Sequence, residues 1–270
     1  MTVLWARLKW TRLKWTRQWI VLAVCVWLWQ LWASARKSPF FPPPSTIFSH
    51  MRQIWFSGPA SHLFLTSDAT GNILPSLYRI ALGLAICVVI GVPLGIALGR
   101  SPMVTAILNP LLQFCRSIPV VTLAPVFFAF FQIGTQMEVA TIVAGTIWPL
   151  LLNTIDGAST VDPVQIETAS AFRLSGWHRL TRVIVPAALP KILTGFRLSL
   201  SLSLILMVFS ELVGSSNGIG YEMNTASQSF DLPGLWSTIV LLGILGFVLN
   251  GVLYGVERWA LRWHYGMRSA

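Results

Sequence analysis

Long apolar runs alternate with short polar segments along the whole chain. A helix needs about 20 apolar residues to cross the hydrocarbon core of a bilayer, and six segments reach or approach that length. We place these spans at about residues 19–35, 73–99, 106–131, 139–156, 191–213 and 235–257. The pattern therefore predicts an all-α, polytopic membrane protein with about six transmembrane helices, organised as a single domain over residues 1–270.

The third span differs from the others because prolines interrupt it. Its interrupting residues are Pro110, Arg116, Ser117, Pro119 and Pro125. Broken backbone at membrane depth is tolerated where it is buried in protein or lines a cavity. Two interpretations stay open: a cytoplasmic half helix followed by a span from about residue 120, or a segment that lines a path. In the second case Ser117, Pro119 and Thr122 are candidate path residues.

The second span carries small residues at helical spacing. Gly91, Gly95 and Gly99 lie at i, i+4 and i+8, on one helix face, where they allow another helix to approach closely. This pattern is common in membrane helices, so it predicts packing and says little about a solute.

The fifth span carries hydroxyl groups on one face. Ser199, Ser203 and Ser210 lie at i, i+4 and i+11, and such a face either hydrogen-bonds a neighbouring helix or lines a polar path. Glu211 follows at the end of the span. An acid inside a membrane is usually functional, although a residue at this position can also reach the interface. We take all four as candidate path residues, with helix packing as the alternative.

Residues 157–190 form a polar, basic segment between the fourth and fifth spans. Asp162 precedes a proline, which is a favourable helix start, and we expect a helix of about ten residues. Ser175 can cap a second short helix, which Pro186 and Pro190 should end before the fifth span. Neither helix is long enough to cross a bilayer. The segment therefore indicates a water-exposed docking surface for a partner protein instead of a plain loop.

Composition and charge fix the environment of the chain. Hydrophobic residues make up 54% and charged residues only 10%, against roughly 25% charged in soluble domains. The net charge of +10 would suggest nucleic acid in a soluble protein, but here the basic residues gather at the ends of apolar runs. About thirteen Lys and Arg fall on the side of the termini and the polar segment, against about four on the other. The positive-inside rule then places both termini and residues 157–190 in the cytoplasm, in a cell (inner or plasma) membrane.

The chain lacks the residue patterns of an enzyme. It contains no Gly-Lys pair and therefore no phosphate-binding loop of the GxxxxGK[ST] type. The four histidines and three cysteines are scattered, without metal-ligand spacing or a nucleophile–base arrangement. We expect no catalytic residues, no metal and no cofactor bound by this chain.

The polar segment resembles the EAA coupling motif of permeases from ATP-binding-cassette (ABC) importers. The matching positions are Glu167-Thr168-Ala169, Val183, Val185 and Pro186. Two positions depart from the motif, with Thr168 for its first alanine and Arg173 where a glycine usually stands. The stretches RIALGLAICVVIGVPLGIALGR, RSIPVVTLAPVFFAFFQIG, NTIDGA and SELVGSSNGIGYEM are similar to the subfamily that imports sulfonates, taurine, nitrate, bicarbonate or vitamin precursors.

This resemblance implies a permease subunit that forms the solute path and couples it to ATP hydrolysis by a separate subunit. The implied partners are a cytoplasmic ABC ATPase dimer that binds ATP and Mg, an extracytoplasmic solute-binding protein, and a second permease, usually an identical copy. The implied solute is a small organic or inorganic anion or a vitamin precursor. The coupling residues it indicates are Glu167, Ala169, Phe172, Arg173, Gly176, Trp177, Val185 and Pro186.

Two alternatives stay open from the residues alone. A self-contained secondary transporter or channel explains the spans and the broken helix, but not the two capped helices of residues 157–190. A membrane anchor or assembly factor explains the spans without any transport. An ATPase that associates with the chain would discriminate the importer from both.

Overall fold

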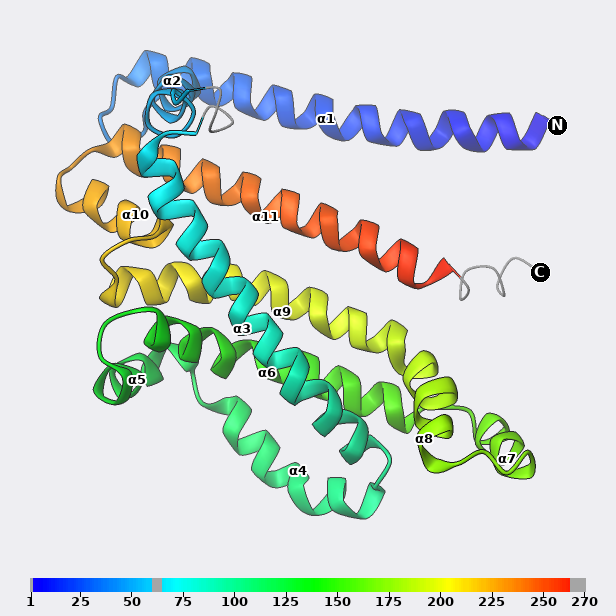
Figure 1. The fold of residues 1–270 in the computed structure, drawn as a ribbon. Helices are drawn as coiled ribbons and strands as arrows, with labels where there is room; N and C mark the ends of the chain where they lie inside the picture. The colour runs from blue at the N-terminus through cyan, green and yellow to red at the C-terminus, as the bar shows by residue number, and fades with distance from the viewer. Residues whose placement is uncertain (1, 60–64, 263–270) are drawn as a thin grey trace. The chain divides into compact units, whose positions relative to one another are not determined.

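The computed structural model describes residues 2–59 and 65–262, so the remaining parts of the predicted domain lie outside the described residues. Every regular element in this part of the chain is helical (Figure 1), which confirms the all-α prediction. The long helices are α1 (Thr2–Arg36), α3 (Ser67–Gly99), α6 (Thr135–Ser159), α9 (Val185–Gly214) and α11 (Leu232–Ala260). The shorter ones are α2 (Pro44–Trp55), α4 (Pro102–Ser117), η2 (Val120–Leu123), α5 (Ala124–Phe131), α7 (Pro163–Ala171), α8 (Gly176–Arg179), η3 (Leu180–Ile184) and α10 (Ile219–Gln228).

The number of membrane spans agrees with the hydropathy pattern. Five described helices are long and apolar enough to cross a bilayer, and a bent pair gives a sixth when its two halves count as one span. That pair is α4 with η2 and α5, which meet at an angle of 79°. The backbone changes direction around Ile118 and Pro119, where the proline disfavours helical geometry in the residue before it. The third predicted span is therefore broken, as its prolines indicate.

Helix α6 packs against both α3 and α9. Cys87 of α3, Leu150 of α6 and Ile192 of α9 belong to one buried cluster. Glycines make these contacts close: a Cβ atom on Gly95 of α3 would lie 2.6 Å from Thr154 Cβ, and one on Gly195 of α9 would lie 2.8 Å from the Pro149 carbonyl oxygen. Small residues let helix backbones approach closely, and here they fix two helices to α6.

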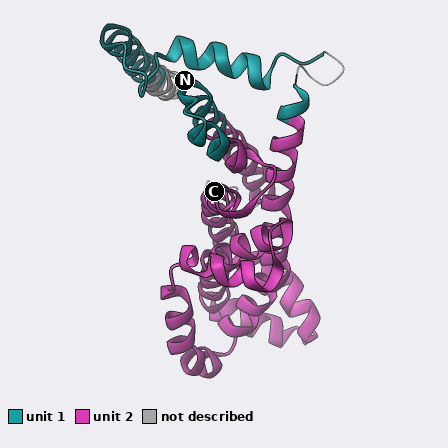
Figure 2. Ribbon diagram, turned by 90° about the vertical axis from the view of Figure 1, so that its left-hand side faces the viewer, with its two compact units in different colours: residues 1–69, 223–241 teal, residues 70–222, 242–270 magenta. Residues whose placement is uncertain are grey.

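The described chain divides into two compact units (Figure 2). The first comprises residues 1–69 and 223–241, and the second comprises residues 70–222 and 242–270. Within the first unit, the rings of Trp29 and Trp236 pack in a tilted arrangement with their centroids 5.3 Å apart, and Ser237 Oγ donates to the Ile47 carbonyl at 3.1 Å. These contacts join α1, α2 and the start of α11. The residues discussed below as candidate sites all belong to the second unit.

The polar segment continues into the membrane without the break that its prolines suggest. Helices α8, η3 and α9 run on as one helical stretch from Gly176 to Gly214. Within it, residues 180–184 form a π turn, and the Val185 N–H donates to the Leu180 carbonyl. Pro186 falls in the first turn of α9, where its missing N–H does least harm, and Pro190 lies inside the helix. The expectation that these prolines end the helix is wrong, because the π turn changes the hydrogen-bond register just before them.

Candidate functional site

Helix α7 begins as the sequence predicts. Asp162 is its N-cap, and the Asp162 carboxylate accepts a hydrogen bond from the Val164 N–H at 2.9 Å. Such a cap satisfies one of the free amides at a helix start and is worth about 1 kcal/mol. The helix is nine residues long, and Ala169 is its buried residue. Ile166 packs against a buried cluster of the chain, whereas Val164, Glu167 and Thr168 are exposed.

The turn after α7 is a Schellman motif with an arginine at its left-handed position. Arg173 has φ +52°, its N–H donates to the Ser170 carbonyl at 2.9 Å, and the Leu174 N–H donates to the Ala169 carbonyl at 3.0 Å. These two bonds define this helix end, whose left-handed residue is usually glycine. The turn therefore keeps the shape that suits the glycine of the family motif, although Arg173 stands there.

Ser175 starts the second short helix. The Ser175 hydroxyl accepts from the His178 N–H at 3.4 Å, as expected for an N-cap. Trp177 lies in the first turn of α8 and is 70% exposed, whereas Ile184, at the end of η3, is buried. The indole therefore points into the surroundings and is free to meet a partner.

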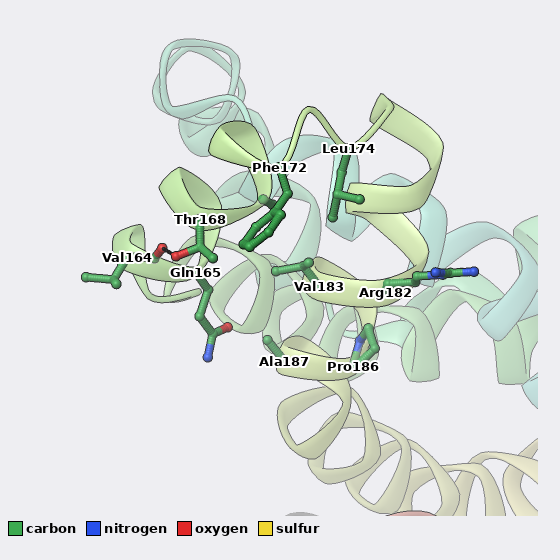
Figure 3. A pocket seen from close by; sticks show the side chains of 10 residues that line it. Val164, Gln165, Thr168, Phe172, Leu174, Arg182, Val183, Pro186 and Ala187 are labelled. Atoms are coloured by element: carbon green, nitrogen blue, oxygen red, sulfur yellow. Dashed lines mark hydrogen bonds between the residues drawn. The ribbon is translucent and has the colours of Figure 1, made fainter.

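A groove lies between α7 and the start of α9, and we call it the α7 groove. Its volume is about 630 Å³. The groove is lined by Val164, Gln165, Thr168, Ala169, Phe172, Leu174, Arg182, Val183, Pro186 and Ala187. Phe172 and Leu174 point from one side toward Val183 on the other (Figure 3). Most of these side chains are apolar, so the groove offers a partner buried hydrophobic contact.

The structure brings together only some of the predicted coupling residues. Ala169, Phe172 and Pro186 line the α7 groove. Val185 instead packs against a buried cluster that contains Ile184. The remaining four are exposed outside the groove, and they are Glu167, Arg173, Gly176 and Trp177.

Five residues that line the groove were not predicted from the sequence, and they are Val164, Gln165, Leu174, Arg182 and Ala187. Val164, Thr168 and Phe172 follow one another at i, i+4 and i+8, and Val183 and Ala187 at i and i+4. This helical spacing was visible in the sequence. The sequence did not show that these two helix faces lie opposite each other. Their opposition depends on the angle between α7 and α9.

The candidate path residues near the break in the third span lie on its surface. Ser117, Pro119 and Thr122 are exposed at the bend between α4 and η2. Both hydroxyls donate to backbone carbonyls three residues earlier, Ser117 to Phe114 and Thr122 to Pro119, each at 2.7 Å. Their role in a path stays a prediction.

The serine face of α9 is buried in the fold. Ser199, Ser203 and Ser210 are each 0% exposed, and the Ser199 hydroxyl donates to the Thr146 carbonyl of α6 at 2.6 Å. The other two donate to carbonyls of α9 itself. This geometry favours the helix-packing alternative for all three, and the path assignment stays a prediction.

Glu211 belongs to a buried cluster of charges, and its assignment to the path stays a prediction. It is 1% exposed, and one of its oxygens accepts from Arg79 Nη1 at 2.6 Å. Arg79 also pairs through Nε with Glu138 at the start of α6 and donates through Nη2 to the Asn217 side chain at 2.7 Å. Ser76 donates to Glu211 at 2.7 Å. One arginine thus connects α3, α6, α9 and the loop before α10.

Of the charged residues in this cluster, only Glu211 was predicted as a site residue. Arg79 and Glu138 are charges at the edges of apolar segments, and that was the available signal. Their mutual pairing joins positions far apart in the chain, which no local pattern reveals. Among the described residues, no group of three or more His, Cys, Asp or Glu side chains is placed to hold a metal ion.

Comparison with known proteins gives this geometry a family context. Residues 91–262 match the family model described as "Binding-protein-dependent transport system inner membrane component". The chain is 31% identical to the taurine transport system permease protein TauC of Escherichia coli, over 90% of this chain and 88% of that protein. It is 30% identical to the putative aliphatic sulfonates transport permease protein SsuC of Bacillus subtilis, over 89% of this chain and 85% of that protein.

A third relative and a solved structure complete the comparison. The bicarbonate transport system permease protein CmpB of Synechococcus elongatus is 29% identical over 87% of this chain and 85% of its own length. The inward-facing MetNI methionine ABC transporter contains a chain of similar fold, with a TM-score of 0.62 and 18% identity. That match covers 69% of this chain and 93% of the other. At this identity it shows a similar fold only.

Proposed function

Because the chain belongs to the family of binding-protein-dependent transport system inner membrane components, we propose that it forms the solute path of an ABC importer and that a separate ATPase drives it. The family is a transport component with several membrane-spanning helices. This membership argues against the two alternatives, a self-contained secondary transporter or channel and a membrane anchor or assembly factor.

The observation that carries the proposal is the α7 groove and its connection to the membrane. Pro186 and Ala187, which line the groove, also lie in the first turn of α9. The helix continues from there, without interruption, to Gly214. A partner that moves α7 therefore acts directly on a spanning helix, as rigid-body coupling between subunits requires.

The partner proposed for this surface is a cytoplasmic ABC ATPase dimer. Glu167 is exposed on α7 and offers a carboxylate to a basic group, while Phe172 and Trp177, 78% and 70% exposed, offer apolar area. ATP and Mg belong to the ATPase, and this chain binds no cofactor. A second copy of the chain completes the path, and an extracytoplasmic binding protein delivers the solute.

The proposed solute is a small anion. Relatives are named for sulfonates, taurine and bicarbonate, and all three solutes carry an anionic oxygen group. Nitrate and vitamin precursors belong to the same wider proposal. We propose an inner-membrane location with both termini in the cytoplasm, and a path that includes Ser117, Pro119 and Thr122 at the bend of the third span.

Reversing the charge of α7 tests the docking proposal. In Glu167→Lys, co-purification of the ATPase should fall about tenfold, which corresponds to about 1.4 kcal/mol, and uptake should fall with it. Glu167→Gln should have a smaller effect because it removes the charge without reversing it. The chain should still insert into the membrane at its normal level.

Asp68→Lys is the matched control, since Asp68 is an exposed acid in the first turn of α3 and belongs neither to α7 nor to the lining of the α7 groove. It should leave ATPase binding unchanged. Normal ATPase binding and normal uptake in Glu167→Lys would show that α7 is not the docking element.

A further inference from the structure

The last turns of α11 and the residues just after them form a basic and aromatic groove, which we call the α11 groove. Its volume is about 720 Å³, and it is lined by Tyr254, Gly255, Arg258, Trp259 and Arg262. All five belong to the second compact unit. The sequence predicts that the sixth span ends at about residue 257. The groove therefore lies where α11 is expected to leave the hydrocarbon core of the membrane.

Two arginines give the α11 groove a positive charge. Arg258 and Arg262 are exposed, and neither forms an ion pair within residues 2–59 and 65–262 of the chain. The acid nearest to them in sequence, Glu257, is 11% exposed and pairs with Arg197 of α9. Like charges four residues apart on a helix repel each other. An anion that binds between the two guanidinium groups would remove this repulsion.

The aromatic side chains orient the groove for hydrogen bonding. Arg258 Cζ lies 5.7 Å from the centroid of the Tyr254 ring, a cation–π contact that holds the guanidinium over the ring face. Its N–H donors form a planar fork that matches the oxygens of a phosphate. Tyr254 and Trp259 are 55% and 69% exposed, so the phenol hydroxyl and the indole N–H can also donate. This set of donors suits a phosphate diester, which accepts hydrogen bonds.

The part of α11 that precedes the groove is apolar and exposed. Val248, Val252 and Val256 follow one another at a spacing of four residues, and they are 50%, 61% and 48% exposed. Gly251 and Gly255 also lie four residues apart, and a Cβ atom added to either would meet nothing within 4 Å. An apolar surface of valine and glycine therefore leads along the helix to the arginines. This surface suits an acyl chain that is joined to a phosphate.

We propose that the α11 groove binds an anionic phospholipid, with the phosphate between Arg258 and Arg262 and an acyl chain along the apolar face of α11. Trp and Tyr are enriched at the membrane–water boundary, where headgroups lie, and basic pockets between spanning helices recognise lipid headgroups. Binding requires only that α11 spans a membrane. The proposal therefore does not depend on the importer function or on its solute.

The charge of the groove selects among phospholipids. Two unpaired guanidinium groups attract a headgroup with a net negative charge, such as that of phosphatidylglycerol. A zwitterionic headgroup carries an ammonium group as well, which the arginines repel. Each arginine near the membrane surface should favour the anionic lipid about fivefold, so the two together should favour it about 20-fold.

Cross-linking with a photoactivatable lipid tests the proposal at the groove itself. The full-length chain, purified with any subunits that accompany it, is placed in phosphatidylcholine nanodiscs with a small fraction of phosphatidylglycerol that carries a diazirine near the start of one acyl chain. The matched probe is phosphatidylcholine with the same diazirine. Peptide mass spectrometry should locate the phosphatidylglycerol label within residues 248–256, at about 20 times the level of the phosphatidylcholine label.

Variants of the groove should change this labelling. Arg258→Gln should lower the phosphatidylglycerol label about fivefold, and its combination with Arg262→Gln should remove the preference for this lipid. Arg116→Gln removes the same charge from an exposed position at the end of α4 and should have no effect. Gly255→Leu should lower the label because the side chain fills the groove. Gly243→Leu, at an equally open glycine of α11 outside the groove, should not.

Three outcomes would overturn the proposal. The first is equal labelling by the two probes, or a preference for phosphatidylglycerol that persists in the double arginine variant. The second is the absence of any label on residues 248–256, which would mean that another chain covers this face of α11. The third is loss of the label when inorganic phosphate is added at constant ionic strength, which would make the groove a site for free phosphate instead of lipid.

Discussion

Arg173 occupies the backbone position at which a helix end most favours glycine. Its left-handed φ of +52° brings the side chain of an L-residue close to its own carbonyl oxygen, which costs roughly 1–2 kcal/mol. The side chain is exposed, so no buried contact compensates locally. The Schellman hydrogen bonds around it hold the turn in this shape nonetheless.

Arg173→Gly should therefore stabilise the protein. Part of the relieved strain is offset by the larger freedom of glycine in the unfolded chain, so we expect a net gain of about 0.5–1 kcal/mol. Thermal unfolding of the purified protein in detergent measures this. The same substitution at Arg179, an exposed position in an ordinary helical turn, should destabilise by a similar amount. A loss of stability in Arg173→Gly would show that the side chain makes a contact that matters more than the strain.

Arg79 balances two buried carboxylates, and its removal should be severe. Arg79→Ala leaves Glu138 and Glu211 buried without a counter-charge, and breaking such a pair costs about 3–5 kcal/mol. Unfolding experiments should show this loss, whereas Arg116→Ala, at an exposed arginine of α4, should change stability little.

Neutralising the whole cluster distinguishes charge from packing. The triple variant Arg79→Met, Glu138→Gln, Glu211→Gln should recover most of the stability lost in Arg79→Ala, because no buried charge then remains unpaired. If the triple variant is as unstable as Arg79→Ala, the cluster matters for its shape and hydrogen bonds instead of its charge.

At the scale of elements, α6 is the helix against which α3 and α9 are fixed. The close contacts with α3 are made at Gly95 and Gly99, where an added Cβ would lie 2.6 Å from Thr154 Cβ and 2.5 Å from the Ile155 carbonyl oxygen. Gly91, one turn earlier, has its nearest neighbour at 3.7 Å. The three glycines of the sequence motif are therefore not equivalent.

Gly95→Ala should destabilise the protein by about 1–3 kcal/mol, since the methyl group overpacks the contact with α6. Gly91→Ala should be neutral or slightly stabilising, because the methyl group meets only ordinary contacts and alanine favours the helix. Thermal unfolding of the two variants side by side measures the difference. Equal effects at the two positions would mean that α3 and α6 do not approach as closely as described.

At the scale of the whole molecule, the distribution of basic residues orients the chain in the membrane. With six spans, we expect α7 and α8 on the cytoplasmic side and the loop between α10 and α11 on the opposite side. Trp177 and Phe230 mark the two sides, and both are exposed, at 70% and 79%.

Single cysteines at these two positions test the orientation. In intact cells, a membrane-impermeant maleimide should label Phe230→Cys and leave Trp177→Cys unlabelled, and permeabilisation should expose the latter. Both variants are made in a background without the native cysteines. Labelling of Trp177→Cys in intact cells would contradict the cytoplasmic location of the polar segment.

Local signals in the sequence determined the helices, the number of spans and the starts of α7 and α8. These signals are hydropathy over about 20 residues, capping side chains and prolines, and each depends only on neighbours along the chain. Asp162 and Ser175 were therefore correctly predicted to start helices. The same reasoning was wrong at Pro186 and Pro190, because the π turn at residues 180–184, which begins five residues after Ser175, changed the hydrogen-bond register.

Only the tertiary structure decided which face of each helix is buried. The spacing of Ser199, Ser203 and Ser210 put them on one face, but contact with α6 made it an inner face and left Arg197 exposed. Arg79 meets Glu138 and Glu211 across 59 and 132 positions of sequence. Such contacts depend on how helices cross, and the pattern within one helix does not contain the position of its neighbours.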